Sequence, residues 1–261
     1  MLKIKKLKVN YTVDGKEIVA VDDVSLHLKK GEVLGIVGES GSGKSTVALS
    51  IMRLISQPGK IVAGEIIYQG QDLLKIKEEE LIKIRGDKIS IVFQDPFTSL
   101  NPVFSVGEQI AEVIRLHQGL SYREAWEMAI EMLDIVNISN PAARAKEYPH
   151  QFSGGMRQRV MIGMALACKP EVLIADEPTT ALDVTIQAEI LKLLEQVRDE
   201  FKLSIIYITH NFGIVKRICD RLAVMCQGKI VEEGETGHVL KHPREVYTRK
   251  LIECVRKINA D

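Results

Sequence analysis

Residues 38–45, Gly-Glu-Ser-Gly-Ser-Gly-Lys-Ser, decide the fold because they match the pattern GxxxxGK[ST] between an apolar strand and a helix. The predicted strand covers Val33–Val37, and the predicted helix covers Lys44–Ile55. Small residues let the backbone turn tightly, so that successive N–H groups and the helix N-terminus point towards a phosphate. Lys44 would neutralise charge on the β- and γ-phosphates, and the Ser45 hydroxyl would be a ligand for Mg²⁺. The loop therefore predicts a nucleoside triphosphate as the ligand.

A second motif supports this interpretation. The apolar run from Val172 ends in two carboxylates, Asp176 and Glu177. A carboxylate at the tip of a strand can hold the Mg²⁺ shell, and the next one could polarise an attacking water. Alone, the pair could equally be a solvated turn, but beside a phosphate loop it predicts hydrolysis. A dinucleotide fingerprint is excluded, because counting GxGxxG from Gly41 puts Thr46 where the third glycine is needed.

Composition sets the broad class of the protein. The chain has 261 residues, 35 basic and 35 acidic side chains, and 46% hydrophobic residues, which excludes disordered, collagen-like and disulfide-scaffold proteins. The balanced charge gives no general reason to bind nucleic acid. Four scattered cysteines without a CxxC pair indicate reduced thiols. The N-terminus lacks the apolar core of a signal peptide, and no apolar run could span a bilayer, so we expect a cytoplasmic globular protein.

The strand and helix patterns predict an α/β core interrupted by a helical insertion. Turn residues and β-rich runs predict strands at 2–11, 18–28, 33–37, 61–68, 88–93, 172–176, 204–209, 221–225 and 229–233. The segment from about Ser105 to Ala167 is almost entirely helical in pattern, with breaks near Gly119, Pro141 and Pro149.

Between the two motifs lies a third, a Ser153-Gly154-Gly155 turn that opens a basic helix. With the phosphate loop and the acidic strand end, it resembles the ATP-binding cassette (ABC) family of transporter ATPases. The resemblance implies a single ABC ATPase domain over 1–261 with a RecA-like P-loop core and an N-terminal antiparallel β subdomain. It also implies an inserted helical signature subdomain at about 95–165 and a C-terminal helical tail at about 235–261.

The resemblance also assigns functional residues across nearly the whole chain. Gln94 stands where the family has its Q-loop glutamine, His210 where it has its switch histidine, and Thr180-Ala-Leu-Asp183 resembles the D-loop. The implied catalytic residues are Glu177, His210, Lys44 and Gln94. The implied Mg²⁺ ligands are Ser45, Gln94 and Asp176. The implied ATP-binding residues are Tyr11, Ser40, Gly41, Ser42, Gly43, Lys44, Ser45, Thr46, Gln94, Ser153, Gly154, Gly155 and Asp183.

The mechanism that this family implies uses two cassettes. They close head to tail, and each ATP is held by one chain's phosphate loop and the partner's signature turn. Tyr11 would stack on adenine, although a lone aromatic at such a place is more often a packing residue. The signature departs from the common LSGGQ form at Phe152 and Met156, and Met156 has no side chain that could donate a hydrogen bond to ribose.

Several stretches resemble the oligopeptide, dipeptide and nickel importers in particular: 35–43, 93–102, 152–159, 180–187 and 242–249. The expected function is therefore the ATPase of a binding-protein-dependent importer, for peptides in the first place. A nickel importer and a soluble ATPase of a phosphonate-lyase-type enzyme complex remain alternatives. Expected partners are two permease subunits, a second ATPase (a paralogue, with a homodimer as the alternative) and, indirectly, an extracytoplasmic binding protein. The expected location is the cytoplasmic face of the membrane.

Overall fold

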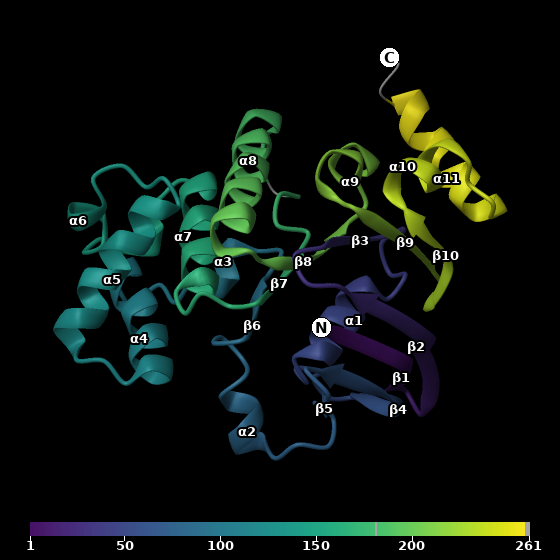
Figure 1. Ribbon diagram of the computed structural model, residues 1–261, viewed down its shortest axis with the longest axis horizontal. Coiled ribbons are helices and arrows are strands. Elements are labelled where there is room, and N and C mark those ends of the chain that lie inside the picture. Colours follow the sequence, from purple (N-terminus) through teal and green to yellow (C-terminus); the bar gives the residue numbers. More distant parts are fainter. Residues whose placement is uncertain (181, 259–261) are drawn as a thin grey trace. The chain divides into compact units, whose positions relative to one another are not determined.

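The computed structural model describes residues 1–180 and 182–258, without the side chains of 254–258, and contains two compact units (Figure 1). The first unit combines Met1–Leu81 with Ser204–Asp261, and the second is Ile82–Leu203. Residue 181 of the predicted D-loop and residues 259–261 of the predicted tail lie outside the described residues. No described helix is long and apolar enough to cross a membrane.

The first unit contains an antiparallel sheet in the order β2-β1-β4-β5. Its strands are β1 (Leu2–Val13), β2 (Lys16–Leu28), β4 (Gly59–Tyr68) and β5 (Gln71–Asp72). The hairpin between β1 and β2 turns at Asp14 and Gly15, which both have positive φ, as a tight two-residue turn requires. The predicted antiparallel subdomain is thus present, and its strands extend a few residues beyond the predicted ends.

The first unit also contains a mixed sheet whose strands follow in the order β10-β9-β3-β8. They are β3 (Val33–Val37), β8 (Ser204–Thr209), β9 (Arg221–Cys226) and β10 (Lys229–Glu235). All residues of β3 are buried, as expected for a strand with parallel neighbours on both sides. The helices of this unit are α1 (Lys44–Ile51), α9 (Phe212–Ile218), α10 (Thr236–Lys241) and α11 (Val246–Ile258).

The prediction that the helix after the phosphate loop continues to Ile55 is wrong, because α1 ends at Ile51. Arg53 adopts φ +49°, which interrupts the helical ladder. Its guanidinium donates to the carbonyls of Leu73 and Ile76, at 3.3 and 2.9 Å. These tertiary contacts favour a turn over a continued helix at this point, and the local apolar pattern does not reveal them.

The second unit carries the parallel strands β6 (Ile89–Val92) and β7 (Val172–Asp176) and most of the helices (Figure 1). The helices and the 3₁₀ turn that follow β6 are α3 (Pro96–Ser99), α4 (Val106–Gln118), α5 (Tyr122–Ile135), α6 (Pro141–Arg144), η1 (Pro149–Gln151), α7 (Gly154–Leu166) and α8 (Val184–Phe201). The short helix α2 (Glu78–Ile82) precedes β6 and belongs to the first unit except for its last residue. Ser105 and Ser121 form capping boxes with Glu108 and Glu124, which explains the starts of α4 and α5. The predicted helical segment and its breaks are confirmed.

One ion pair in the first unit lies in a largely buried position. Arg221 at the start of β9 bonds Glu32 at 2.8 Å and also pairs with Glu233. Burial acts to lower the pKa of Arg221, but the two carboxylates outweigh it and raise that pKa. Glu32 is 8% exposed, so its charge depends on the arginine for compensation.

We therefore expect Arg221→Met to lower the free energy of unfolding by about 2–4 kcal/mol, because Glu32 would keep a buried charge without its partner. Urea unfolding of the purified chain measures this. Arg123→Met is the control, since Arg123 forms an exposed pair with Glu127 whose loss should cost under about 1 kcal/mol. Equal effects of the two substitutions would contradict the assignment.

Candidate active site

The phosphate loop connects β3 to α1, and the ammonium group of Lys44 is folded into it. Lys44 is 5% exposed, and its Nζ donates to the carbonyl oxygens of Gly38 and Glu39 at 2.9 and 2.8 Å. The side chain therefore folds back over the loop from the first turn of the helix. Both of these acceptors are neutral carbonyl oxygens, so neither of them cancels the positive charge of the ammonium. This placement fits the predicted role of Lys44 towards a triphosphate.

Two positions in the loop have no room for any side chain and therefore require glycine. A Cβ on Gly38 would lie 2.1 Å from the carbonyl oxygen of Met225, and a Cβ on Gly43 would lie 2.4 Å from that of Ala20. Gly43 also has φ +102°, a conformation that favours glycine. By contrast, Gly41 has φ +78° but open space around it. The loop is thus pressed against β2 and β9 at both ends and open in the middle.

The loop also carries a buried polar atom without a partner. Ser42 is 4% exposed, and its Oγ has no hydrogen-bond partner among the described residues. Such a hydroxyl is costly unless another group satisfies it. Together with Lys44 and the helix N-terminus, it makes the loop rich in donors, which fits a phosphate ligand.

Two further predicted residues lie in the first unit. Val37 of β3 pairs with Thr209 of β8, so the exposed His210 and the phosphate loop leave the sheet at the same edge. Tyr11 of β1 pairs with Gly59 of β4, and a Cβ on Gly59 would lie 2.6 Å from the Tyr11 ring. The ring therefore covers this glycine, and its predicted stacking on adenine stays a prediction.

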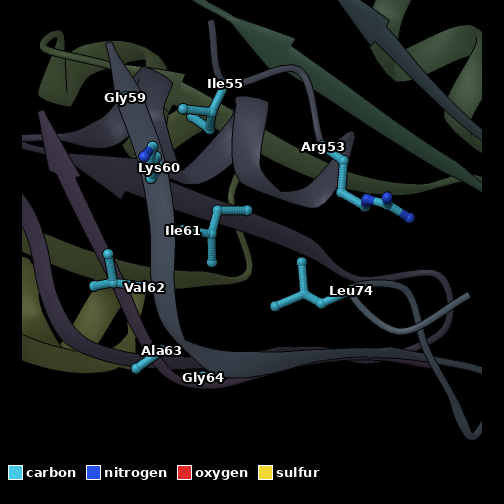
Figure 2. A pocket seen from close by; sticks show the side chains of 9 residues that line it. All are labelled: Arg53, Ile55, Gly59, Lys60, Ile61, Val62, Ala63, Gly64 and Leu74. Carbon is cyan, nitrogen blue, oxygen red and sulfur yellow. The ribbon is translucent and has the colours of Figure 1, made fainter. Parts of the chain in front are cut away.

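A groove of about 370 Å³ runs along β4 in the same unit (Figure 2). Its walls are residues 59–64 of the strand, with Arg53, Ile55 and Leu74 around them. Figure 2 shows the Arg53 guanidinium directed away from the strand, where it bonds the backbone. None of the predicted site residues lines this groove, so the groove is not part of the predicted site.

In the second unit, two predicted residues from distant parts of the sequence meet. Gln94 follows β6, and its Nε2 donates to Oε2 of Glu177 at 3.2 Å. Glu177 follows β7 and has φ +48°, and the hydroxyl of Thr180 donates to the same oxygen at 2.8 Å. Asp176 ends β7 and is 7% exposed. Gln94 and Thr180 thus both donate to Glu177; the sequence placed Thr180 in the D-loop segment but did not suggest this bond.

The signature turn and the D-loop come together in the second unit. Ser153 is the N-cap of α7 and accepts a hydrogen bond from the Met156 N–H at 3.3 Å. Asp183 is the N-cap of α8 and accepts one from Ile186 at 3.0 Å. A Cβ on Gly155 would lie 2.6 Å from Ile186, so a glycine lets α7 approach α8 closely. Both helices therefore begin with a polar cap and free N–H groups in their first turns.

The predicted residues are thus divided between the two units. Tyr11, the loop residues Ser40 to Thr46 and His210 belong to the first, whereas Gln94, Ser153 to Gly155, Asp176, Glu177 and Asp183 belong to the second. Ser45 is exposed at the start of α1.

Comparisons with known proteins agree with this geometry. Residues 21–180 match the ABC transporter family. The chain is 48% identical to a probable peptide ABC transporter ATP-binding protein of Sinorhizobium fredii, over 98% of this chain and 76% of that protein. It is 49% identical to an oligopeptide transport ATP-binding protein of Bacillus subtilis, over 97% of this chain and 71% of that protein. A dimeric ATP-binding cassette solved with ADP and phosphate has a TM-score of 0.80 at 32% identity and covers 90% of this chain and 99% of its own.

The two kinds of loop glycine give a direct test of the geometry. We expect Gly43→Ala to lower the free energy of unfolding by about 3 kcal/mol or more, because the methyl group would overlap the Ala20 carbonyl at positive φ. Gly41→Ala should cost about 1–2 kcal/mol, since only backbone strain opposes it. Urea unfolding measures the free energy of unfolding of both variants. A larger loss in Gly41→Ala than in Gly43→Ala would contradict the close contact at Gly43.

Proposed function

The chain belongs to the ABC transporter family, and we propose that it is the ATP-hydrolysing subunit of an importer for di- or oligopeptides. The observation that carries the ATPase activity is the phosphate loop with the Lys44 ammonium folded into it. The peptide assignment is supported by relatives that are named as peptide transport or import proteins. They are 48–49% identical to this chain over 97–99% of its length.

The proposed roles follow from the donors and acceptors of each residue. Ser40 to Thr46 would bind the phosphates through backbone N–H groups and hydroxyls, and Lys44 would offset their charge. Ser45, Gln94 and Asp176 offer the oxygen ligands that Mg²⁺ prefers. When bound, Mg²⁺ would withdraw charge from the β- and γ-phosphate oxygens. Tyr11 would stack on adenine.

Glu177 would orient the attacking water. Its Oε2 accepts hydrogen bonds from Gln94 and Thr180, and these bonds hold the carboxyl group in one orientation. His210 would contact the γ-phosphate from the sheet edge that it shares with the loop. These are hydrolytic roles, in which positioning and electrostatics supply most of the catalysis.

We propose further that two ATPases close around the nucleotides. Ser153, Gly154 and Gly155 start a helix of 13 residues, whose first N–H groups and dipole suit a phosphate of the opposing chain. Asp183 would act at the same interface. The partner is a paralogous ATPase, with a second copy of this chain as the alternative. In this proposal residues 1–261 form one ABC ATPase domain, with a helical subdomain at about 95–165 and a helical tail at about 235–261.

Membrane partners would dock on the second unit. Its exposed apolar side chains include Phe97, Val103, Phe104, Leu116 and Tyr122. Phe104 and Tyr122 line one cavity of about 200 Å³ together with Glu112. Apolar exposure of this kind marks interaction sites. We propose that two permease subunits dock here, that the chain is peripheral at the cytoplasmic face of the membrane, and that an extracytoplasmic binding protein delivers the substrate to the permeases.

For the activity, we expect Lys44→Ala to abolish ATP hydrolysis through the loss of phosphate binding. Glu177→Gln should lower kcat by at least about 10²-fold while ATP still binds, because a positioned general base contributes on that scale. Phosphate release and nucleotide binding measure the two effects. Gel filtration with ATP should show the Glu177→Gln protein as a dimer. Hydrolysis at the wild-type rate by Glu177→Gln would disprove the role of this residue.

For the partners, the chain should be tagged in its native cell and purified from gently solubilised membranes. We expect mass spectrometry to identify two polytopic permeases and a second ATPase. Phe104→Glu should remove the permeases, because a charge would enter the apolar surface, while the ATPase activity of the purified chain persists. Val62→Glu, on the exposed face of β4, is the matched control and should keep them. Recovery of soluble enzymes alone would favour the enzyme-complex alternative.

A further inference from the structure

The C-terminal helix α11 starts from a fixed point on β10. Glu232 of β10 is 9% exposed, and its carboxylate accepts the N–H groups of Arg244 and Glu245 at 2.9 and 3.1 Å. Burial acts to raise the pKa of Glu232, but these hydrogen bonds outweigh it and lower that pKa. The ionised carboxylate therefore binds the chain just before the helix N-terminus, where its charge also favours the helix dipole. The position of the first turn of α11 is set by this contact.

Tyr247 in that first turn reaches the phosphate loop. Its Oη accepts a hydrogen bond from the backbone N–H of Glu39 at 3.3 Å. Its hydroxyl also lies within hydrogen-bonding reach of the Cys226 side chain at the end of β9. Burial raises the pKa of Tyr247 further above neutrality, so the group at this contact is a neutral hydroxyl. One phenol thus joins three segments that are far apart in the sequence.

The bond is made at a sensitive place in the loop. The carbonyl of Glu39 accepts from Lys44 Nζ at 2.8 Å, while its N–H donates to Tyr247. On the other side of the loop, the Gly228 N–H donates to the carbonyl of Ser42 at 3.0 Å. The β9–β10 turn therefore supports the loop at Ser42, after its open part at Gly41, and the C-terminal helix supports its beginning at Glu39. The Lys44 ammonium bonds the carbonyls of Gly38 and Glu39, on the part of the loop that Tyr247 contacts.

We propose that Tyr247 is a positioning residue for the nucleotide site, which holds Glu39 and through it Lys44 in the geometry that binds the triphosphate. The inference rests on the proposed ATPase function. Tyr247 itself bonds the loop and acts through it. Because a loop that is ordered before binding loses less entropy on binding, this hydrogen bond should increase nucleotide affinity. The C-terminal helix thereby becomes part of the apparatus that sets this affinity.

The test compares Tyr247→Phe, which keeps the ring and removes the hydroxyl, with the wild-type chain. We expect the Kd of a non-hydrolysable ATP analogue, measured in the presence of Mg²⁺, to rise about two- to ten-fold, which is the range for one lost neutral hydrogen bond. KM for ATP should rise by the same factor with kcat unchanged, as for loss of uniform binding. Hydrogen exchange of the Glu39 amide should be faster in the nucleotide-free variant. Glu232→Gln, which loosens the helix start, should weaken binding in the same direction.

Tyr148→Phe is the matched control, since Tyr148 stacks on His150 in the second unit and should change none of these values. Unchanged affinity and amide exchange in Tyr247→Phe, with a wild-type chain that binds ATP, would overturn the inference and leave the proposed function intact. A lower melting temperature with unchanged Kd and KM would overturn it too, because it shows a merely structural contact. A wild-type chain that does not bind ATP would refute both.

Discussion

The close approach of the phosphate loop to its neighbours is the constraint on which the first unit depends. At Gly38 and Gly43 the loop backbone lies against the carbonyls of Met225 and Ala20, where no side chain fits. This contact requires β2 and β9 to be in place, and β9 is held by its parallel pairing with the buried strand β3. A strand of the antiparallel sheet and a strand of the mixed sheet therefore both contact this loop, and its open part around Gly41 is accessible to a ligand.

The second unit follows a different physical logic, in which helix caps place the chemistry. Ser105 and Ser121 begin the helices of the insertion, and Ser153 and Asp183 begin α7 and α8. Each cap side chain accepts a hydrogen bond from an N–H group that has no partner within the helix. The caps Ser153 and Asp183 also fix the two turns that have a proposed function. The hydrogen bond from Gln94 to Glu177 then links the end of β6 to the end of β7.

Much of this arrangement could be predicted because its signals are local. Strands β3, β7 and β8 have the predicted bounds, since apolar runs bounded by turn residues define buried strands well. The phosphate loop and the signature turn are short motifs whose mechanism depends on neighbouring residues. The end of α1 was not predicted, because the bonds of Arg53 to Leu73 and Ile76 join segments about twenty residues apart.

The sequence by itself determined the α/β fold class, the order of the main elements and the phosphate loop, since each follows from local patterns of residue types, while the other candidate residues were named through the family resemblance. Tertiary structure alone decided which groups hold these residues. Thr180 and Gln94 meet on Glu177, and Tyr247 meets Glu39 across more than two hundred residues of chain. Such contacts depend on directions of strands and helices in space, and a hydrogen bond forms only when folding brings donor and acceptor within about 3 Å.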